Sequence, residues 1–160
     1  MGILLGSIHR LTRYFLIVGE IALTFMMFLT VADVILRSFR RPIVGTYEIV
    51  AFSAAVAIGF SLPLTSWMRG HVYVDLFTEK LSPKARNLLN IATRCIVLVL
   101  FLLIGSRLIR YGINLHRVKE VSMTLQLPFY PVAYGLAACC FTQCLVMFCD
   151  IVKIFGGEYE

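Results

Sequence analysis

The chain has 160 residues, of which 59% are hydrophobic and 15% charged, with a formal net charge of +6. Soluble domains are about 45 to 50% apolar, so this composition and a mean hydropathy of +0.85 exclude an ordinary soluble protein. The basic residues stand in the breaks between long apolar runs, where they anchor and orient helices, and we expect no nucleic-acid binding. The sequence predicts one all-α integral membrane domain over residues 1–160.

The first apolar run predicts a membrane-spanning helix over about residues 12–37, preceded by Arg10 and Arg13. A secretory signal peptide begins in the same way, but its apolar stretch has only about 7 to 15 residues. We therefore interpret this run as an uncleaved helix. A short basic loop with Arg40 and Arg41 follows it.

The second run predicts a spanning helix over about residues 46–68, with Thr46 as its N-cap and Glu48 in its first turn, where the helix dipole favours an acid. Small residues at four-residue spacing allow a neighbouring helix to pack closely. They form two rows, Ala51, Ala55 and Gly59, and Ser53, Ala57 and Ser61. Residues 72–82, too short and polar to span, predict an interfacial amphipathic helix, with a solvated loop as the alternative.

Two further runs predict spanning helices over about residues 84–117 and 128–153. The third helix is too long to cross a hydrocarbon core of about 30 Å upright, so it must tilt or project into water. Four spans place both termini on one side of the membrane. The basic residues divide equally between the two sides, so only the arginines before the first helix favour cytoplasmic termini.

The sequence contains none of the motifs typical of an enzyme or a cofactor site. It has no HExxH, no GxGxxG and no phosphate loop. His9, His71 and His116 lie in or beside polar breaks, whereas haem would need histidines within the bilayer. The five cysteines form no CxxC pair and stand in apolar runs, which indicates reduced thiols. We expect no enzyme activity, no cofactor and no metal.

Ionisable residues within the spans are a sharper signal, because charge inside a bilayer is costly and is usually paired. Glu20 and Arg94 lie at similar depths along their helices, about 13 and 15 Å from the same side, so we predict a buried ion pair between them. Asp33 and Arg37 are one turn apart and are predicted to pair at a helix end. Charge neutralisation within the bundle and a site for a transported ion or proton both remain open.

Several short motifs, in order along nearly the whole chain, resemble those of one transporter family. They are DVILRSF followed by GTYEIVAF, RGHVYVDLF, the Leu81-Ser82-Pro83 break, and SMTLQLPFYPVAYG before the fourth helix. Together they resemble the small, Q-type (DctQ-like) membrane subunit of TRAP, or tripartite ATP-independent periplasmic, transporters. The cysteine-rich fourth helix departs from the family pattern.

The resemblance implies a scaffold subunit of a secondary-active uptake system for organic acids in the bacterial inner membrane, driven by an ion gradient, with sodium as the expected ion. A large membrane subunit would carry the substrate and ion sites. A soluble periplasmic substrate-binding protein would dock on both subunits. The small-residue rows and the apolar faces would pack against the large subunit. The interfacial helix would keep the small subunit at a fixed depth in the bilayer.

The loop between the first and second spans and the loop between the third and fourth spans both contain basic residues. These residues lie on the outer side of the membrane if the termini are cytoplasmic. Membrane anchoring explains them in part, and we also expect Arg40, Arg41, Arg117 and Lys119 to form a dock for an acidic rim on the binding protein. The competing class is a self-sufficient four-helix transporter, similar to small multidrug exporters, that uses intramembrane carboxylates. The interfacial helix and the long third helix favour a subunit with a partner.

Overall fold

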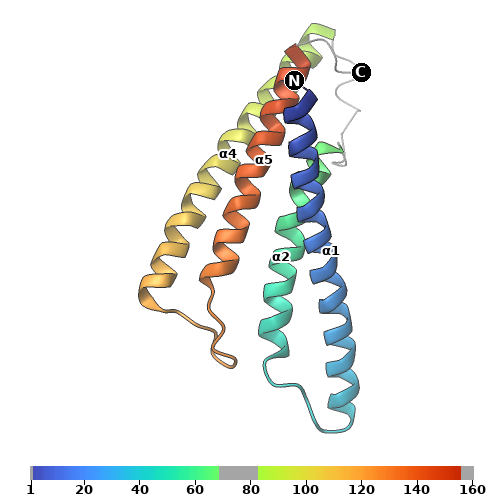
Figure 1. The fold of residues 1–160 in the computed structure, drawn as a ribbon, viewed down its shortest axis with the longest axis vertical. Coiled ribbons are helices and arrows are strands. Elements are labelled where there is room, and N and C mark those ends of the chain that lie inside the picture. Colours follow the sequence, from blue (N-terminus) through green and yellow to red (C-terminus); the bar gives the residue numbers. More distant parts are fainter. Residues whose placement is uncertain (1, 69–82, 156–160) are drawn as a thin grey trace.

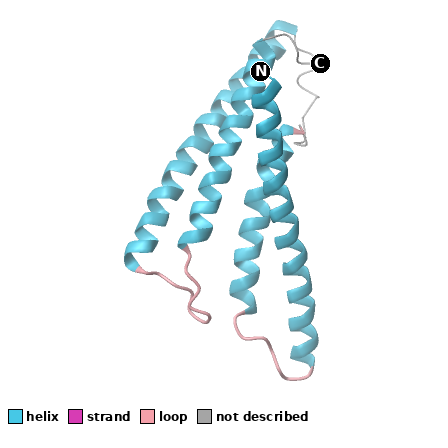
Figure 2. Cartoon of the chain, in the orientation of Figure 1, coloured by secondary structure: helices cyan, strands magenta, loops and turns pink. Residues whose placement is uncertain are grey.

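The computed structural model describes residues 2–68 and 83–155, which are almost entirely helical (Figure 2). The helices in this part are α1 (Gly2–Ser38), α2 (Thr46–Trp67), α4 (Pro83–Val118) and α5 (Tyr130–Phe155). All four are long and apolar enough to cross a membrane. The predicted all-α class with four spans is confirmed. The predicted interfacial helix at residues 72–82 lies outside the described residues.

The helices form two antiparallel pairs, α1 with α2 and α4 with α5, which meet through α2 and α5 (Figure 1). The pairs lie close together where the chain begins and diverge toward residues 39–45 and 119–129. We call residues 39–45 the first loop, residues 119–129 the third loop, and this end of the molecule the loop end. In Figure 1, α2 and α5 lie between α1 and α4.

α1 packs on α2 through a single stripe of residues spaced three or four apart. Thr12, Gly19 and Asp33 are buried on this stripe. A Cβ atom at Gly19 would lie 3.2 Å from the carbonyl oxygen of Ala57, so the missing side chain sets how closely the helices approach. Most of the remaining α1 surface consists of exposed apolar side chains, as is normal for a helix that faces lipid or another subunit.

α5 is the innermost helix, and three of its cysteines are buried. Cys139, Cys140 and Cys144 are buried, and the Sγ of Cys144 lies 3.6 Å from the carbonyl oxygen of Leu98 on α4. A Cβ atom at Gly105 of α4 would lie 3.3 Å from the Cβ of Cys140. The small thiols of Cys140 and Cys144 thus let α4 and α5 approach closely. None of the five cysteines forms a disulfide within the described residues.

The N-cap of α2 lies one residue earlier than predicted, so the helix already includes Thr46. Gly45 occupies the N-cap position with φ 80°, in the left-handed region that glycine adopts without strain. Thr46 is already inside the helix, and its hydroxyl donates to the carbonyl oxygen of Ile43 at 2.9 Å. The predicted cap was therefore wrong by one position, because a threonine at this φ would be strained. α2 then continues through Pro63 to Trp67.

Candidate functional site at the loop end

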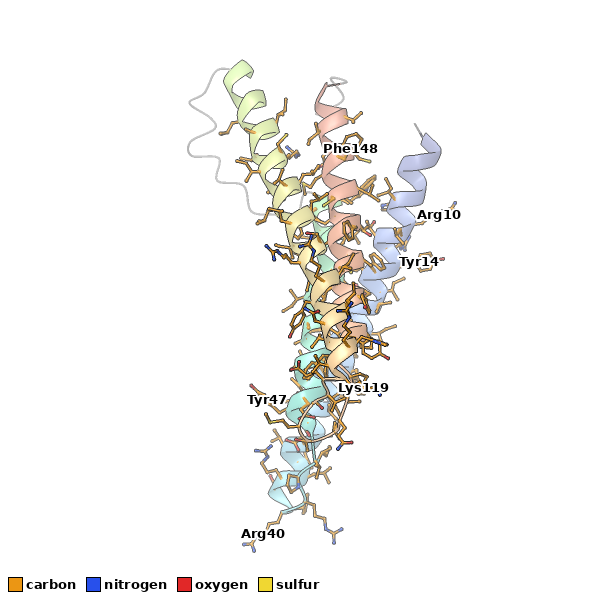
Figure 3. The ribbon with its side chains drawn as sticks, turned by 90° about the vertical axis from the view of Figure 1, so that its left-hand side faces the viewer. Arg10, Tyr14, Arg40, Tyr47, Lys119 and Phe148 are labelled. Carbon is orange, nitrogen blue, oxygen red and sulfur yellow. The ribbon has the colours of Figure 1, made fainter. Side chains whose placement is uncertain are left out.

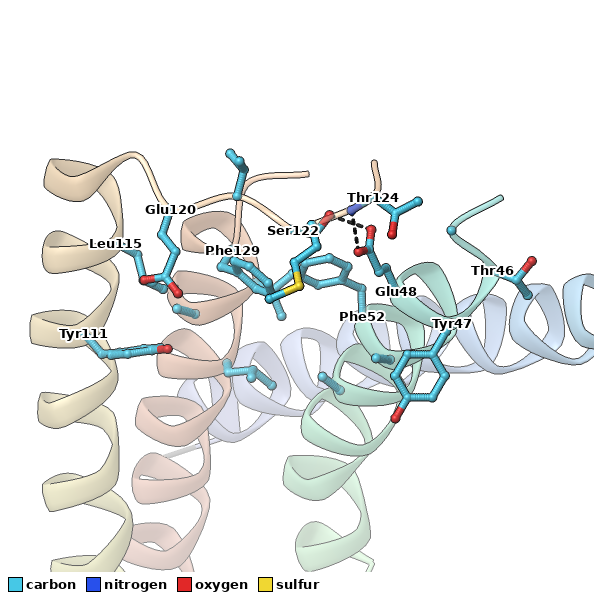
Figure 4. A pocket seen from close by; sticks show the side chains of 18 of the residues that line it. Thr46, Tyr47, Glu48, Phe52, Tyr111, Leu115, Glu120, Ser122, Thr124 and Phe129 are labelled. Carbon is cyan, nitrogen blue, oxygen red and sulfur yellow. Dashed lines mark hydrogen bonds between the residues drawn. The ribbon is translucent and has the colours of Figure 1, made fainter. Parts of the chain in front are cut away.

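The carboxylate of Glu48 joins the first turn of α2 to the third loop (Figure 4). It accepts hydrogen bonds from the hydroxyl of Ser122 at 2.6 Å and from the backbone N–H groups of Thr124 at 2.8 Å and Leu125 at 3.0 Å. A carboxylate has about four acceptor positions, so most of its capacity is used by the third loop. We call this arrangement the Glu48 junction.

The third loop has a small hydrogen-bonded structure of its own, centred on Ser122. The N–H of Ser122 donates to the carbonyl oxygen of Leu127 at 2.9 Å, and the Ser122 hydroxyl oxygen accepts from the N–H of Leu127 at 3.1 Å. Val121 and Pro128 form an isolated antiparallel bridge. Because Ser122 is buried and bonded on both sides, Glu48 fixes the whole loop and not one residue of it.

The first and third loops also touch directly at Gly45. A Cβ atom at Gly45 would overlap the side chain of Leu125. Gly45 is therefore required twice, once for its positive φ of 80° and once for the space that Leu125 fills. The contact and the Glu48 junction together make the two loops one unit.

Asp33 and Arg37 anchor the other side of the first loop. The Nη2 of Arg37 lies 2.7 Å from Asp33 Oδ2, at the spacing from which the pair was predicted. The second oxygen of Asp33 accepts the N–H of Ile43 at 3.0 Å, a contact that the sequence did not suggest. Because Asp33 is buried, its charge needs partners within the molecule, and the guanidinium of Arg37 and the N–H of Ile43 provide them.

The predicted pair of Glu20 with Arg94 is not formed. Arg94 is buried and faces Asp150 on α5, with its Nε 3.6 Å from Asp150 Oδ2. Glu20 is exposed on α1. The depth argument assumed that the first and third spans are neighbours, whereas α2 and α5 lie between them. Asp150 was overlooked, although a single acid in an apolar run was a usable signal.

A second buried polar contact, between α2 and α5, was also missed. The amide nitrogen of Gln143 lies 2.6 Å from the hydroxyl oxygen of Ser66, and both side chains are buried. Nothing in the spacing of either run indicated that these residues meet, because they are far apart in the sequence. Such interhelical hydrogen bonds hold membrane helices in register.

The small-residue rows are divided between different environments. Ala57 and Gly59 are buried in helix contacts: Ala57 against Gly19 of α1, and Gly59 against Leu136 of α5. Ala51 and Ala55 line a cavity. Ser53 and Ser61 are half-buried, and the hydroxyl of Ser61 donates within its own helix, to the carbonyl oxygen of Ile58 at 2.9 Å.

The cavity, of about 810 Å³, lies between the two helix pairs behind the Glu48 junction (Figure 4). Its deeper wall is mostly apolar, and it includes Phe52, Leu108 and Leu136. Among the described residues, the cation in its lining is Arg37, which is paired with Asp33. Glu48 and Glu120 also line it, so the cavity has the wrong charge for an organic anion.

The predicted dock residues are exposed at the loop end, but at different heights. Figure 3 places Lys119 level with Tyr47, and Arg40 farther out. Arg40 and Lys119 each lie just beyond the C-terminus of a helix, α1 and α4 respectively, and each has a positive φ, of 59° and 53°. There Arg41 N–H donates to the Leu36 carbonyl, and Glu120 N–H donates to the Leu115 carbonyl, as in a Schellman motif. Arg41 and Arg117 adjoin these residues and are also exposed.

The description "Tripartite ATP-independent periplasmic transporters, DctQ component" belongs to a family model that matches residues 26–157. A search of curated proteins and a search of solved structures returned no match. The matched range includes α2, α4, the Glu48 junction and both loops. With its four membrane-spanning helices, the chain fits a multi-pass inner-membrane component of a transporter and not an enzyme. The chain belongs to the DctQ family, whose members are the small membrane subunits of TRAP transporters.

Proposed function

We propose that this subunit is the scaffold of an organic-acid uptake system, that it packs against a large membrane subunit, and that its loop end helps to dock a soluble binding protein. The ATP-independence in the family description supports an ion gradient as the energy source that we propose, with sodium as the ion. The termini are cytoplasmic in this proposal, so the loop end is periplasmic.

The observation that carries the proposal is the union of the first and third loops into one unit. Glu48 and Gly45 join two segments that are far apart in the sequence, and each segment carries exposed basic residues. A partner that approaches from the aqueous side would meet both at once. A rigid, positively charged end suits the electrostatic capture of a protein with an acidic rim.

The orientation is tested with a cysteine in the third loop. Met123 is fully exposed, with a relative accessibility of 100%, so Met123→Cys places a thiol where a reagent can reach it. In intact spheroplasts, an impermeant maleimide should label the variant, and the unmodified chain is the blank. Labelling only after the membrane is opened would reverse the proposed topology.

Docking is tested by removing charge without disturbing the loop backbone. Arg40 and Lys119 have positive φ, so glutamate or alanine there would add strain, whereas asparagine tolerates this conformation. The variant Arg40→Asn, Arg41→Gln, Arg117→Gln, Lys119→Asn should slow association of the binding protein at low salt. The difference should shrink as ionic strength rises, because exposed charges are screened over about 8 Å at physiological salt.

A matched pair of variants separates the role of the Glu48 junction from charge alone. Glu48→Gln and Glu120→Gln both remove one negative charge from the loop end, but only Glu48 holds the third loop. We expect Glu48→Gln to slow docking and Glu120→Gln to leave it unchanged or faster. Equal effects of the two variants would mean that the ordered loop plays no part in docking.

The scaffold proposal also requires that the isolated subunit binds no organic acid. Two buried polar contacts between helices, Arg94 with Asp150 and Ser66 with Gln143, are made within the subunit itself. Calorimetric titration of the purified subunit with C4-dicarboxylates and sugar acids should give no saturable heat. Saturable binding would favour a self-sufficient transporter instead.

A further inference from the structure

Glu20 is an exposed carboxylate in the middle of a membrane-spanning helix. It lies one residue after Gly19, which faces α2, so its side chain leaves the helix about 100° away from that contact. Within the described residues, its carboxylate forms no ion pair and no hydrogen bond, and the interactions of its backbone carbonyl with Thr24 are internal to α1. The bundle itself therefore does not use this charge.

Glu20 lies so deep in the span that its side chain does not readily reach water on the side of the membrane where the termini lie. Tyr14 is exposed at the terminal end of the span, where aromatic residues mark the headgroup level (Figure 3). The rings of His9 and Trp67 lie 5.8 Å apart in the same region. Glu20 is about 9 Å deeper than Tyr14 and about 16 Å deeper than His9, measured along the helix. In lipid, an acidic residue so far inside the core is rare and usually paired.

The arginines exposed on α4 differ from Glu20 in this respect. Arg107 and Arg110 lie closer to the loop end of their helix, and their long side chains can extend along apolar surface to the headgroups. Glutamate has a short side chain and cannot do the same from its depth. Glu20 is thus the exposed charge that most needs a partner from outside the chain.

The residues around Glu20 form a continuous exposed face. At helical spacing, Ile17, Glu20, Thr24, Met27 and Val31 follow one another along α1, and all are exposed. We call these five residues the Glu20 face. The face combines apolar side chains with two polar ones, one turn apart, and the hydroxyl of Thr24 donates to the Glu20 carbonyl at 2.8 Å. A purely lipid-facing surface would have no use for a carboxylate beside a hydroxyl.

We propose that the Glu20 face is the surface on which the large membrane subunit packs, and that this subunit presents a basic or hydrogen-bond-donating side chain to Glu20. The inference rests on the proposed scaffold function and adds the surface and the chemistry of the contact. Charge complementarity selects the partner, because a carboxylate at this depth is matched by a lysine, arginine, histidine or amide donor on a facing helix. Lipid acyl chains offer no such group.

The test begins with the wild-type chain, co-expressed with the large subunit and purified in mild detergent. Retention of the large subunit in a one-to-one complex, identified by mass spectrometry, tests the proposed function itself. A preparation without it would overturn the scaffold function and this inference together. The following two measurements use that complex, so their failure leaves the scaffold function intact.

The first measurement is the reaction of Glu20 with dicyclohexylcarbodiimide, an apolar reagent that modifies carboxyl groups within membranes. Peptide mass spectrometry gives the rate at Glu20, and Glu20→Gln is the blank. The rate should be at least tenfold lower in the complex than in the isolated subunit. Equal rates would show that Glu20 faces lipid in the assembled transporter and would overturn the proposal.

The second measurement compares Glu20→Leu with Val18→Leu. Val18 is also exposed on α1, on the opposite side of the helix from Glu20, so the two variants introduce the same residue on different faces. Glu20→Leu should weaken retention of the large subunit at least tenfold, while the isolated variant stays as stable as wild type. Val18→Leu should retain it fully, and Glu20→Gln should fall between them. Equal retention in both leucine variants, or self-association abolished by Glu20→Leu, would overturn the proposal.

Discussion

α5 and α1 are both apolar enough to span a membrane, yet they have opposite roles in the bundle. In the most apolar 18-residue window of each span, 44% of α5 is buried within the molecule and only 6% of α1. α5 contacts both α2 and α4, and its polar residues Gln143 and Asp150 point inward to partners. α1 contacts mainly α2, and its polar residue Glu20 points outward.

The difference shows that polarity within a span has two uses, which the direction of the side chain distinguishes. An inward polar residue, such as Asp150, fixes how the helices of the subunit pack against each other. An outward one, such as Glu20, has no partner within the described residues, and in our proposal its partner belongs to the large membrane subunit. Substitutions in α5 should therefore affect folding, whereas substitutions on the outer face of α1 should affect assembly.

The largest effect on folding is expected for Asp150→Ala. It removes the carboxylate that the buried guanidinium of Arg94 faces, and breaking a buried ion pair by removing one partner costs about 3 to 5 kcal/mol. Reversible unfolding of the subunit in SDS and detergent mixtures measures the loss. Glu20→Ala in the isolated subunit should change stability little, because its side chain has no partner there within the described residues.

A double-mutant cycle shows whether the loss comes from the pair. Arg94→Ala should also destabilise the subunit, and the double variant should recover much of the loss, since it removes both charges. Losses that simply add would assign the effect to packing alone. A cycle of the same kind between Glu20 and Arg94 should show no coupling, since the two residues lie on helices separated by α2 and α5.

Much of the fold was predictable because span length and apolar content depend on local sequence. The four spans, their order and the Asp33–Arg37 contact all follow from spacing within one helix. The bounds of α2, α4 and α5 agree with the predicted ones to within two residues, and the start of α1 does not. α1 begins at Gly2, well before residue 12, since its first turns combine apolar and basic residues and lack an apolar run.

The site was less predictable because its contacts join residues far apart in the sequence. Glu48 was predicted to lie in the first turn of α2, where the helix dipole favours a negative charge, and it does lie there. Its three hydrogen bonds, however, come from the third loop. The order of helices in the bundle decided which residue faces Arg94, and no local pattern contains that order. Depth along a helix is therefore a necessary condition for pairing and not a sufficient one.

A smaller effect on stability is expected from a comparison of two glycines of α1, one packed against α2 and one near the exposed start of the helix. Gly19→Ala and Gly6→Ala make the same change in the same helix, with the same gain in helix propensity. A Cβ atom at Gly19 meets the backbone of Ala57 at 3.2 Å, whereas nothing lies within 4 Å of one at Gly6. Gly19→Ala should destabilise the subunit by about 1 to 2 kcal/mol, typical of overpacking, in the same SDS titration. Gly6→Ala should be neutral or stabilising, and equal results would mean that α1 and α2 can move apart freely.

The cysteines allow the same comparison between a packed and an open position. Cys140→Ser places a hydroxyl in the buried contact of α5 with α4, and it should cost about 1 kcal/mol because its hydrogen bonds are poorly satisfied there. Cys95 is exposed on α4, and Cys95→Ser should be nearly neutral. Thiol labelling in detergent provides an independent measurement, with Cys95 reacting first. Fast labelling of Cys140 in the folded subunit would contradict the packing of α4 on α5.

The smallest effect is expected for the hydrogen bond between Ser66 and Gln143. Although it is buried and short at 2.6 Å, such bonds between membrane helices contribute only about 0.6 kcal/mol on average, because the separated helices also find polar partners. The cycle of Ser66→Ala, Gln143→Leu and the double variant should therefore give a coupling near this value. Gln143 Oε1 has no hydrogen bond, so leucine also removes a buried unsatisfied acceptor and offsets part of the loss. A coupling above about 2 kcal/mol would show that this contact, and not the packing of small residues, holds α2 on α5.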